Sequence, residues 1–324
     1  MRQGFGIFVA LLCSVAFAGP RRWADRPNNG KIDPMQSAAL FVGVREFDDT
    51  SLTPVAYAVD DAVDLAFELT LSKQPALVDP KRVILALSGE PQKSESQQKL
   101  RDLLAAGATR KPAGQSDIIN LLESQSRSVG ASGILIAAFA THGVSDEGIQ
   151  YLLTASSVLT HYHSTSLTEA EIRDTVTSNG VARSLIFVDA CRERLTKDRR
   201  NGDVDPRSVA AGFARAMSKI NGQVMLSAAV AGGYAYDDDV RRNGVFTATV
   251  IEGLRCGANT NEAGFVTVDT LHSYVEEHVL SWLRAHKDPG VKKATQWLSE
   301  GDSKEMPLSV CVSRTASASR PRSR

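Results

Sequence analysis

The sequence predicts an α/β fold with a mostly parallel central sheet flanked by helices. Short apolar runs alternate with segments of helical periodicity along most of the chain, which is the pattern of β-α-β units. Two runs, Gly133–Gly143 (GILIAAFATHG) and Ser184–Glu193 (SLIFVDACRE), begin with continuous apolar stretches typical of buried parallel strands. Each ends abruptly on small or polar residues and carries a reactive side chain, His142 in the first and Cys191 in the second.

The first half of the chain is expected to contribute two further strands and two helices. Ala39–Val44 (ALFVGV) is a first strand and Arg82–Leu87 (RVILAL) a second. Between them, Pro54 opens a helix, because proline suits the first helical position and apolar residues then recur at helical spacing. Gly89–Gln115 is polar, and we expect a loop there; Ser116 then caps a helix, SDIINLLESQSR.

The second half continues the same alternation. YLLTAS, after the His142 run, is a short strand or hairpin arm, and Thr168 with Glu171 forms a capping box before the helix EIRDTVTS. A charged loop without periodicity, RERLTKDRRNGDVDPRS, follows Cys191. The remaining expected elements are a helix near Val209–Lys219, a strand Gln223–Ala229, a loop AGGYAYDDDVRRNG, a helix VFTATVIEGLR and a longer helix near Asp269–His286.

Composition excludes some classes of function. The 324 residues suffice for one large domain, and 43% hydrophobic with 23% charged residues is typical of a globular protein. Lys and Arg total 37, the same as Asp and Glu, so no net positive field supports binding to nucleic acid. We find no internal repeat and no transmembrane helix, and we expect a monomer.

The N-terminus predicts a secretory signal peptide over residues 1–18. Arg2 precedes the apolar stretch Gly6–Val15, and Ala16-Phe17-Ala18 is a cleavage site of the A-x-A type. The competing interpretation is an uncleaved N-terminal anchor. With cleavage the protein is secreted or periplasmic, residues 19–36 form a linker, and the Ser/Arg-rich residues 312–324 form a disordered tail.

Three cysteines remain after cleavage: Cys191, Cys256 and Cys311. An odd number in an oxidising compartment indicates one disulfide and one free thiol. Cys191, at a strand end, is the natural free thiol, and Cys256–Cys311 is then a candidate disulfide. The sequence leaves open whether these two approach within bonding distance.

His142 and Cys191 are expected to form a catalytic pair. In an open α/β sheet, ligands bind at the carboxyl ends of the strands. If the two strands are neighbours, a thiol and an imidazole meet there, as a nucleophile beside an acid–base partner. The alternative is that Cys191 is a buried structural residue, which is the commoner role of a cysteine at a strand end when no other motif accompanies it.

The two motifs resemble those of the caspase-fold cysteine peptidases of the C14 type, in their metacaspase and bacterial orthocaspase branch. His142 lies 49 positions before Cys191, which stands in the box Asp-Ala-Cys-Arg-Glu; caspases have a similar spacing and a Q-A-C box. The resemblance runs from about Ala39 to Val310 and includes ALFVG, YAVDDA, THG, DACRE, NGVFT and ATQWL. It implies a caspase-like three-layer sandwich, with the peptidase domain over residues 37–311.

The resemblance also implies roles for individual residues. Cys191 would attack the scissile carbonyl, and His142 would activate the thiol and protonate the leaving amine. A thiol with an ordinary pKa near 8.5 is only a few per cent ionised at neutral pH, so such help is needed. The backbone N–H groups of Gly143 and Cys191 would bind the oxyanion, an interaction worth roughly 3 kcal/mol.

Substrate selection is implied by two carboxylates. Asp61 and Asp189 match the aspartates that line the S1 pocket of metacaspases, and two such charges favour Arg or Lys at P1 and repel Asp. Several alternatives stay open: Asp60 competes with Asp61, a solvated helix position is the alternative for Asp61, and capping of the following turn is the alternative for Asp189.

Other features of the sequence point away from cofactors and from other sites. Most of the acidic residues that form the calcium site of many metacaspases have no counterpart in this sequence, and Asp198 is the one clear match. Glu193 stands where caspases have a glycine. We therefore expect no metal and no cofactor.

His161 and His163 are interpreted as an exposed loop, and a solvated loop is favoured for Asp237–Asp239. The basic residues after Cys191 are a candidate self-cleavage site: Arg194, Lys197, Arg199 and Arg200.

The sequence thus predicts a cysteine endopeptidase that cleaves proteins or peptides after Arg or Lys. A catalytically silent caspase-fold interaction module is the alternative from another class. A thiol-dependent hydrolase or transferase of a non-peptide acyl substrate would share the same Cys–His machinery.

Overall fold

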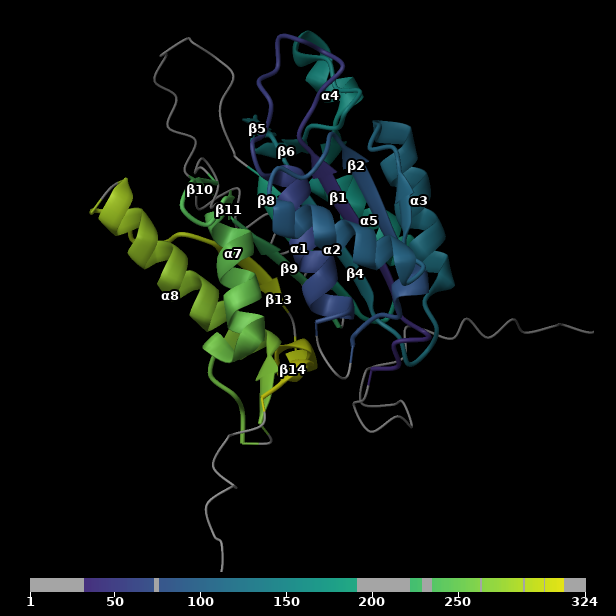
Figure 1. Ribbon diagram of the computed structural model, residues 1–324, viewed down its shortest axis with the longest axis vertical. Coiled ribbons are helices and arrows are strands. Elements are labelled where there is room, and N and C mark those ends of the chain that lie inside the picture. Colours follow the sequence, from purple (N-terminus) through teal and green to yellow (C-terminus); the bar gives the residue numbers. More distant parts are fainter. Residues whose placement is uncertain are drawn as a thin grey trace, which may run out of the picture.

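The computed structural model describes residues 32–72, 76–190, 222–228, 235–262, 264–287, 289–299 and 301–311. Its centre is a seven-stranded sheet in the order β13-β9-β8-β4-β1-β2-β3 (Figure 1). The strands are β1 (Ala38–Val44), β2 (Val83–Ser88), β3 (Thr109–Lys111), β4 (Leu135–Thr141), β8 (Ser184–Ala190), β9 (Gln223–Ser227) and β13 (Gln296–Ser299). Neighbours from β3 to β9 pair in parallel, and only β13 is antiparallel to its neighbour β9. The predicted α/β class and the mostly parallel sheet are confirmed.

Helices cover both faces of this sheet, and alternate strand residues supply the two cores. Phe41 of β1 and Phe187 of β8 belong to the core beneath α1 (Ala58–Thr70), α7 (Val245–Glu252) and α8 (Val268–His286). Phe139 of β4 belongs to the other core, beneath α3 (Gln115–Ser128) and α5 (Glu169–Ser178). Because both faces are covered, every residue of β1 and β4 is buried, which explains their continuous apolar sequences.

Small sheets surround the carboxyl end of the central sheet. β5 (Gly143–Asp146), β6 (Ile149–Leu152) and β7 (Leu167–Thr168) follow β4 directly, and β10 (Asp237–Asp238) pairs with β11 (Asn243–Gly244) just before α7. YLLTAS is thus a hairpin arm, as expected. The remaining pair is β12 (Phe265–Thr267) with β14 (Pro307–Val310), and α4 (Tyr162–Thr165) precedes β7.

Three expectations of local structure are wrong. The helix expected from Pro54 begins at Ala58, because Val55 donates its N–H to the carbonyl of Arg45 and the chain stays in a loop as far as Tyr57. The segment expected to be a loop, Gly89–Gln115, contains α2 (Ser94–Ala105) and β3. The next helix, α3, begins at Gln115 after Gly114 rather than at a Ser116 cap.

The start of α2 depends on a contact that is distant in sequence. The carboxylate of Asp60, on α1, accepts the N–H groups of Gln92 and Lys93 at 2.8–3.0 Å. These amides precede a helix whose own N-cap residue makes no side-chain cap hydrogen bond. By contrast, the local capping box of Thr168 and Glu171 is present as predicted.

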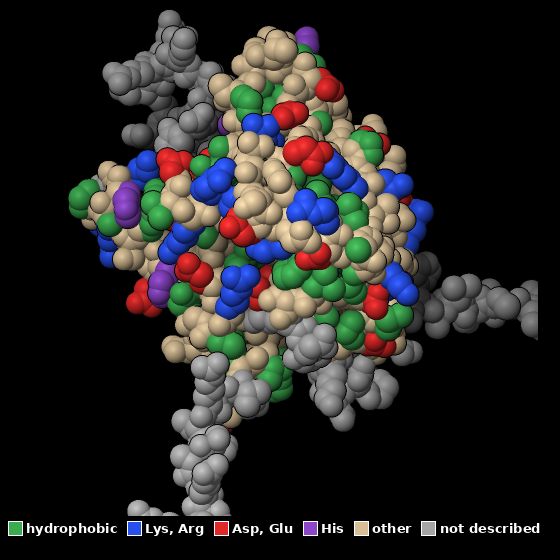
Figure 2. Space-filling view, in the orientation of Figure 1, with side chains coloured by type: hydrophobic (Ala, Val, Ile, Leu, Met, Phe, Trp, Pro, Cys, Tyr) green, Lys and Arg blue, Asp and Glu red, His purple; other side chains and the backbone are tan. Residues whose placement is uncertain are grey.

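Several predictions concern residues outside those that the structure describes. They are the signal peptide, most of the linker, Cys191 with the charged loop after it, the helix near Val209–Lys219 and the tail at 312–324. Among the helices that are described, none is sufficiently long and apolar to cross a bilayer. Basic and acidic side chains are interspersed over the face of the molecule seen in Figure 2.

Candidate active site

The two strands that precede the predicted catalytic residues are direct neighbours. β4 and β8 pair in parallel over their whole length, and the last pair in register is Thr141 with Ala190. His142 and Cys191 are the next residues of the two chains. His142 is described, whereas Cys191 is not, so the pairing locates the strand ends but not the thiol itself.

The imidazole of His142 is oriented by the loop between β1 and α1. Its Nε2 lies 2.8 Å from the carbonyl oxygen of Thr53, and Phe47 stacks on its ring with centroids 5.6 Å apart and planes 17° apart. A carbonyl can only accept, so in the neutral imidazole Nε2 carries the hydrogen and Nδ1 has the lone pair. Neither Thr53 nor Phe47 can be found from the sequence, since a loop 89 residues earlier carries no local signal for this contact.

The backbone around His142 is held by the hairpin that follows it. Leu153 donates its N–H to the carbonyl of His142 at 2.9 Å, and the Thr141 hydroxyl donates to the carbonyl of Leu153 at 2.6 Å. Gly143, the expected oxyanion residue, opens β5 and pairs with Leu152. The hairpin therefore fixes where the chain turns away from the sheet.

Asp61 and Asp189, the two predicted specificity residues, come together at the start of α7. Asp61 accepts the N–H of Gly244 at 3.0 Å and the Nδ2–H of Asn243 at 2.8 Å. Asp189 accepts the N–H and the hydroxyl of Thr247 at 3.2 and 2.6 Å. Both carboxylates line one small cavity beneath Thr247, between α1, α7 and the central strands.

Gly244 separates the two carboxylates at close range. A Cβ atom at this position would lie 2.4 Å from Oδ2 of Asp189 and 3.1 Å from Oδ2 of Asp61. A side chain would overlap the first carboxylate, so the residue here has to be glycine. The NGVFT segment noted in the sequence owes its glycine to this contact.

The environment of the two aspartates disfavours their charged forms. Burial, together with the nearby charge of Asp189, raises the pKa of Asp61 well above its usual range, against the opposing hydrogen bonds from Asn243 and Gly244. Burial raises the pKa of Asp189 to about 6, although the hydrogen bonds from Thr247 oppose this. A cation that entered between them would relieve both effects.

The structure also distinguishes Asp61 from its neighbour. Asp60 is fully buried and binds the backbone before α2, so it does not face Asp189. Asp61 is 4% exposed, and the interpretation of this side chain as a solvated helix residue is wrong. The hydrogen bonds of Asp189 in the described residues go to Thr247 of α7, far along the chain from the turn it might have capped.

A third carboxylate, that of the exposed residue Asp237, lies at the edge of the same region. Asp237 pairs with Gly244 in the β10–β11 ladder and is therefore directly opposite the glycine that touches Asp61 and Asp189. Desolvation of its carboxylate and the charge of Asp239 raise the pKa of Asp237, and His142 lowers it. Asp237 and Asp239 are exposed, as the solvated-loop interpretation expects, whereas Asp238 departs from it: this residue is buried and accepts the N–H groups of Val240 and Arg241.

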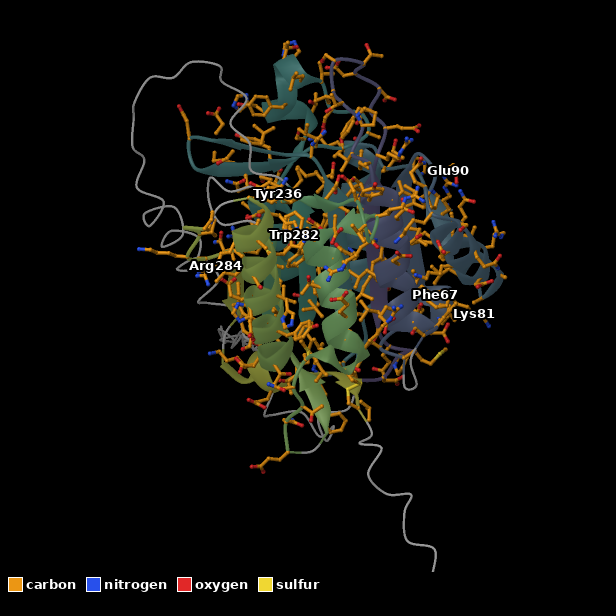
Figure 3. The ribbon with its side chains drawn as sticks, turned by 60° about the vertical axis from the view of Figure 1, so that its left-hand side comes forward. Phe67, Lys81, Glu90, Tyr236, Trp282 and Arg284 are labelled. Carbon is orange, nitrogen blue, oxygen red and sulfur yellow. A yellow bond between two sulfur atoms is a disulfide. The ribbon has the colours of Figure 1, made fainter. Side chains whose placement is uncertain are left out.

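The segment that carries Asp237 is attached to α8. The ring of Tyr236 lies 6.0 Å from that of Trp282, centroid to centroid, and Figure 3 shows the two labelled side chains next to each other. Lys287 covers both rings, at 4.9 and 5.8 Å from their centroids. On the other side, the Tyr57 hydroxyl donates to Asp239.

The remaining candidate residues are away from this region or serve the scaffold. His161 and His163 are exposed, as expected; His163 stacks on Tyr162 and lies 2.9 Å from a carboxylate oxygen of Asp146. No three His, Cys, Asp or Glu side chains are arranged to hold a metal ion in the part of the chain that the structure describes.

Cys256 and Cys311 are joined by a disulfide, with their Cα atoms 5.8 Å apart, which is the pairing the sequence left open.

Comparisons with known proteins agree with this architecture. The model of the caspase domain family matches residues 36–317. Caspase-1 from Spodoptera frugiperda has a similar structure, with a TM-score of 0.53 and 15% identity over 91% of this chain and 99% of that one. A protein from Geobacter sulfurreducens aligns with a TM-score of 0.50 and 13% identity over 85% of this chain and 99% of its own. No curated protein matches in sequence.

Proposed function

The chain belongs to the caspase domain family, a family of cysteine peptidases, and we propose that it is an endopeptidase with Cys191 as nucleophile and His142 as acid–base partner. The parallel register that ends at Thr141 and Ala190 supports this pairing, because these are the residues immediately before His142 and Cys191. The carbonyl of Thr53 supports the role of His142, since it occupies Nε2 and leaves Nδ1 as the basic nitrogen.

The proposed reaction proceeds through an acyl-enzyme. His142 takes the thiol proton of Cys191, and the thiolate attacks the scissile carbonyl while the N–H groups of Gly143 and Cys191 stabilise the oxyanion. The imidazolium then gives its proton to the leaving amine. In the second half, His142 takes a proton from water as it attacks the thioester, and returns this proton to the sulfur of Cys191 when the acid is released.

We further propose that the enzyme cleaves after Arg or Lys, which places it in the metacaspase-like branch. The observation that carries this proposal is the buried pair of carboxylates, Asp61 and Asp189, on either side of Gly244. A guanidinium or ammonium group would neutralise a pair whose charges burial disfavours, whereas an acidic P1 residue would add a third negative charge.

Two further proposals concern the surroundings of the enzyme. The Cys256–Cys311 disulfide supports a secreted or periplasmic location, because disulfides persist in oxidising compartments. We also propose that catalysis requires no metal or cofactor, because the Cys–His chemistry is complete without one. Activity is therefore expected to survive EDTA, and loss of activity that calcium restores would contradict this.

A peptide panel tests the proposed function. Fluorogenic peptides that differ only in P1 (Arg, Lys, citrulline or Asp) would be incubated with the wild type and with Cys191→Ala. We expect cleavage of the Arg and Lys peptides by the wild type alone. Equal rates in the two proteins would remove Cys191 as the nucleophile, and no cleavage of any peptide would favour the silent interaction module. Preferred cleavage after Asp would overturn the role assigned to Asp61 and Asp189.

A further inference from the structure

A chain of polar contacts leads from a buried lysine to Asp61. The Nζ of Lys93 contacts both Oδ2 of Asp64 and Oδ1 of Asn243. The Nδ2–H of Asn243 in turn donates to Asp61 at 2.8 Å, with a longer contact of 3.2 Å to Asp64. Lys93 is 9% exposed, and the proposed catalytic mechanism does not use it.

Lys93 determines which way the Asn243 amide points. An ammonium group can only donate hydrogen bonds, so the amide oxygen has to face Lys93. The NH2 group then faces Asp61, which can accept when ionised. In the reversed orientation, two donors would face each other at Lys93, and two oxygens would face each other at Asp61.

The lysine is itself held in place from two sides. Its backbone N–H donates to Asp60 at 2.8 Å. Two consecutive aspartates of α1 therefore have linked roles. Asp60 holds the backbone of Lys93, and Asp61 accepts a hydrogen bond from the Asn243 amide that Lys93 orients. Its partner Asp64 also accepts from Lys99 and from the Ser96 hydroxyl, each at 2.8 Å. Asp64 therefore has a second cation that does not touch Asn243.

Asp61 is surrounded by groups that oppose its charge. The charges of Asp189 on β8 and of the exposed Asp237 on β10 both act on Asp61, and Asp64 lies one turn along its own helix. The donors on the opposite side come from β11, namely the N–H of Gly244 and the amide of Asn243. Asn243 is thus the one side chain among the described residues that donates to Asp61 directly, and its orientation depends on Lys93.

We propose that Lys93 is a positioning residue for substrate selection: it fixes the amide of Asn243 and thereby holds the Asp61 carboxylate ready to bind a cationic P1 side chain. This inference rests on the proposed function, in which Asp61 and Asp189 select Arg or Lys. Without Lys93, the amide oxygen loses its donor, so the amide is held from one side only and Asp61 keeps its proton to a higher pH. The enzyme would then lose preference for charged P1 side chains while the Cys–His chemistry stays intact.

The test compares Lys93→Gln with Lys99→Gln, both in the Cys191→Ala protein. Each substitution removes one cation from Asp64, but only the first removes the contact to Asn243. The titration of Asp61 would be followed by NMR of 13C-labelled aspartate, with its signal identified by comparison with Asp61→Asn. Benzamidine, a small guanidinium analogue, would report cation binding by calorimetry.

We expect Lys93→Gln to move the Asp61 titration to higher pH and to weaken benzamidine binding at pH 7 about tenfold, with recovery at higher pH. Lys99→Gln should change binding by less than about twofold. Equal effects of the two variants, or an unchanged Asp61 titration in Lys93→Gln, would overturn the proposal. If the wild-type site does not bind benzamidine, the proposed specificity fails, whereas the Asp61 titration still decides the role of Lys93.

A second variant covers the case in which Lys93→Gln does not fold. Asn243→Asp is nearly isosteric and gives Lys93 a carboxylate partner, but it presents an oxygen to Asp61 in place of the N–H donor. We expect a larger upward shift of the Asp61 titration than in Lys93→Gln. In an Asn243→Ala background, Lys93→Gln should add little, because the intermediary is missing. Full additivity of the two effects would contradict transmission through the amide.

Discussion

The carboxylates of Asp61 and Asp189 both lie against the backbone of Gly244. The glycine N–H donates to Asp61, and the absence of a side chain leaves room for Asp189. Asp61 comes from the helix after the first strand, Asp189 from the strand before Cys191, and Gly244 from the hairpin before α7. Three parts of the chain that are distant in sequence therefore build the acidic region to which we assign substrate selection.

Replacement of this glycine should disrupt the region directly. In Gly244→Ala the new Cβ would overlap Oδ2 of Asp189, and either the carboxylate or the hairpin must move. We expect a loss of about 1–3 kcal/mol in unfolding free energy, as for other overpacked sites, and a fall of at least tenfold in kcat/KM for P1 Arg peptides. Chemical denaturation and peptide kinetics measure the two effects.

A matched control for this variant is Gly180→Ala. Gly180 has a φ of +69° and no neighbour within 4 Å of an added Cβ, so alanine there should destabilise the fold by about 1 kcal/mol without a change in kcat/KM. Normal cleavage of P1 Arg peptides by Gly244→Ala would show that the two carboxylates do not act together.

The preference for charged P1 side chains should depend on pH. The pKa of Asp189 is raised to about 6, so this carboxyl gains a proton as the pH falls through that value, and the pKa of Asp61 is raised as well. We expect the ratio of kcat/KM for P1 Arg to that for the uncharged isostere citrulline to fall below about pH 6 and to rise above it. The ratio cancels the titration of the catalytic pair, which both peptides share. A ratio that is constant from pH 5 to 8 would contradict this prediction.

Asp189→Asn should make the fold more stable at neutral pH but impair cleavage of basic substrates. The raised pKa means that the folded state holds this proton more tightly than the unfolded chain, whose usual value is 3.8. Wild-type stability from this group is therefore present at low pH and lost as the pH rises from about 4 through 6. The amide avoids this loss, so the variant should be about 1–3 kcal/mol more stable than the wild type at pH 7.5 but not at pH 4.

The same variant should be a poor enzyme for basic substrates. Removal of one charge from the pair should lower kcat/KM for P1 Arg roughly 100-fold, with little change for citrulline. Denaturation curves at the two pH values, measured with these rates, check both parts. A variant less stable than the wild type at pH 7.5 would mean that Asp189 is a net stabilising residue.

Phe47 should orient the catalytic imidazole. Its ring stacks on His142, so Phe47→Ala removes this contact and leaves those of Nε2 with the carbonyl and the hydroxyl of Thr53. We expect kcat to fall about tenfold with KM nearly unchanged, because the acidic region is not touched. Phe67→Ala, on the outer side of α1, removes a similar partly buried ring and should lower stability but not kcat. Equal losses of kcat in both variants would point to a general effect on the fold.

Much of the fold could be predicted because its signals are local. The strand before His142 and the strand before Cys191 are buried on both faces, and a continuous apolar run is the direct consequence of such burial. The capping box at Thr168 and Glu171 is likewise a contact between residues three apart. By contrast, the sequence predicts a loop in place of α2, because the carboxylate at its N-terminus, that of Asp60, comes from another helix.

The sequence by itself determined the α/β alternation, the candidate pair His142 and Cys191, and the candidate carboxylates Asp189 and Asp61, the last with Asp60 as a competitor; all of them stand in contiguous motifs. Only the tertiary structure decided that Asp61 rather than Asp60 faces Asp189, that Gly244 separates them, and that Asp237 and Lys93 adjoin them. The reason is physical: periodicity reports which face of an element is buried, whereas contacts across 30 to more than 180 residues arise only when the elements pack.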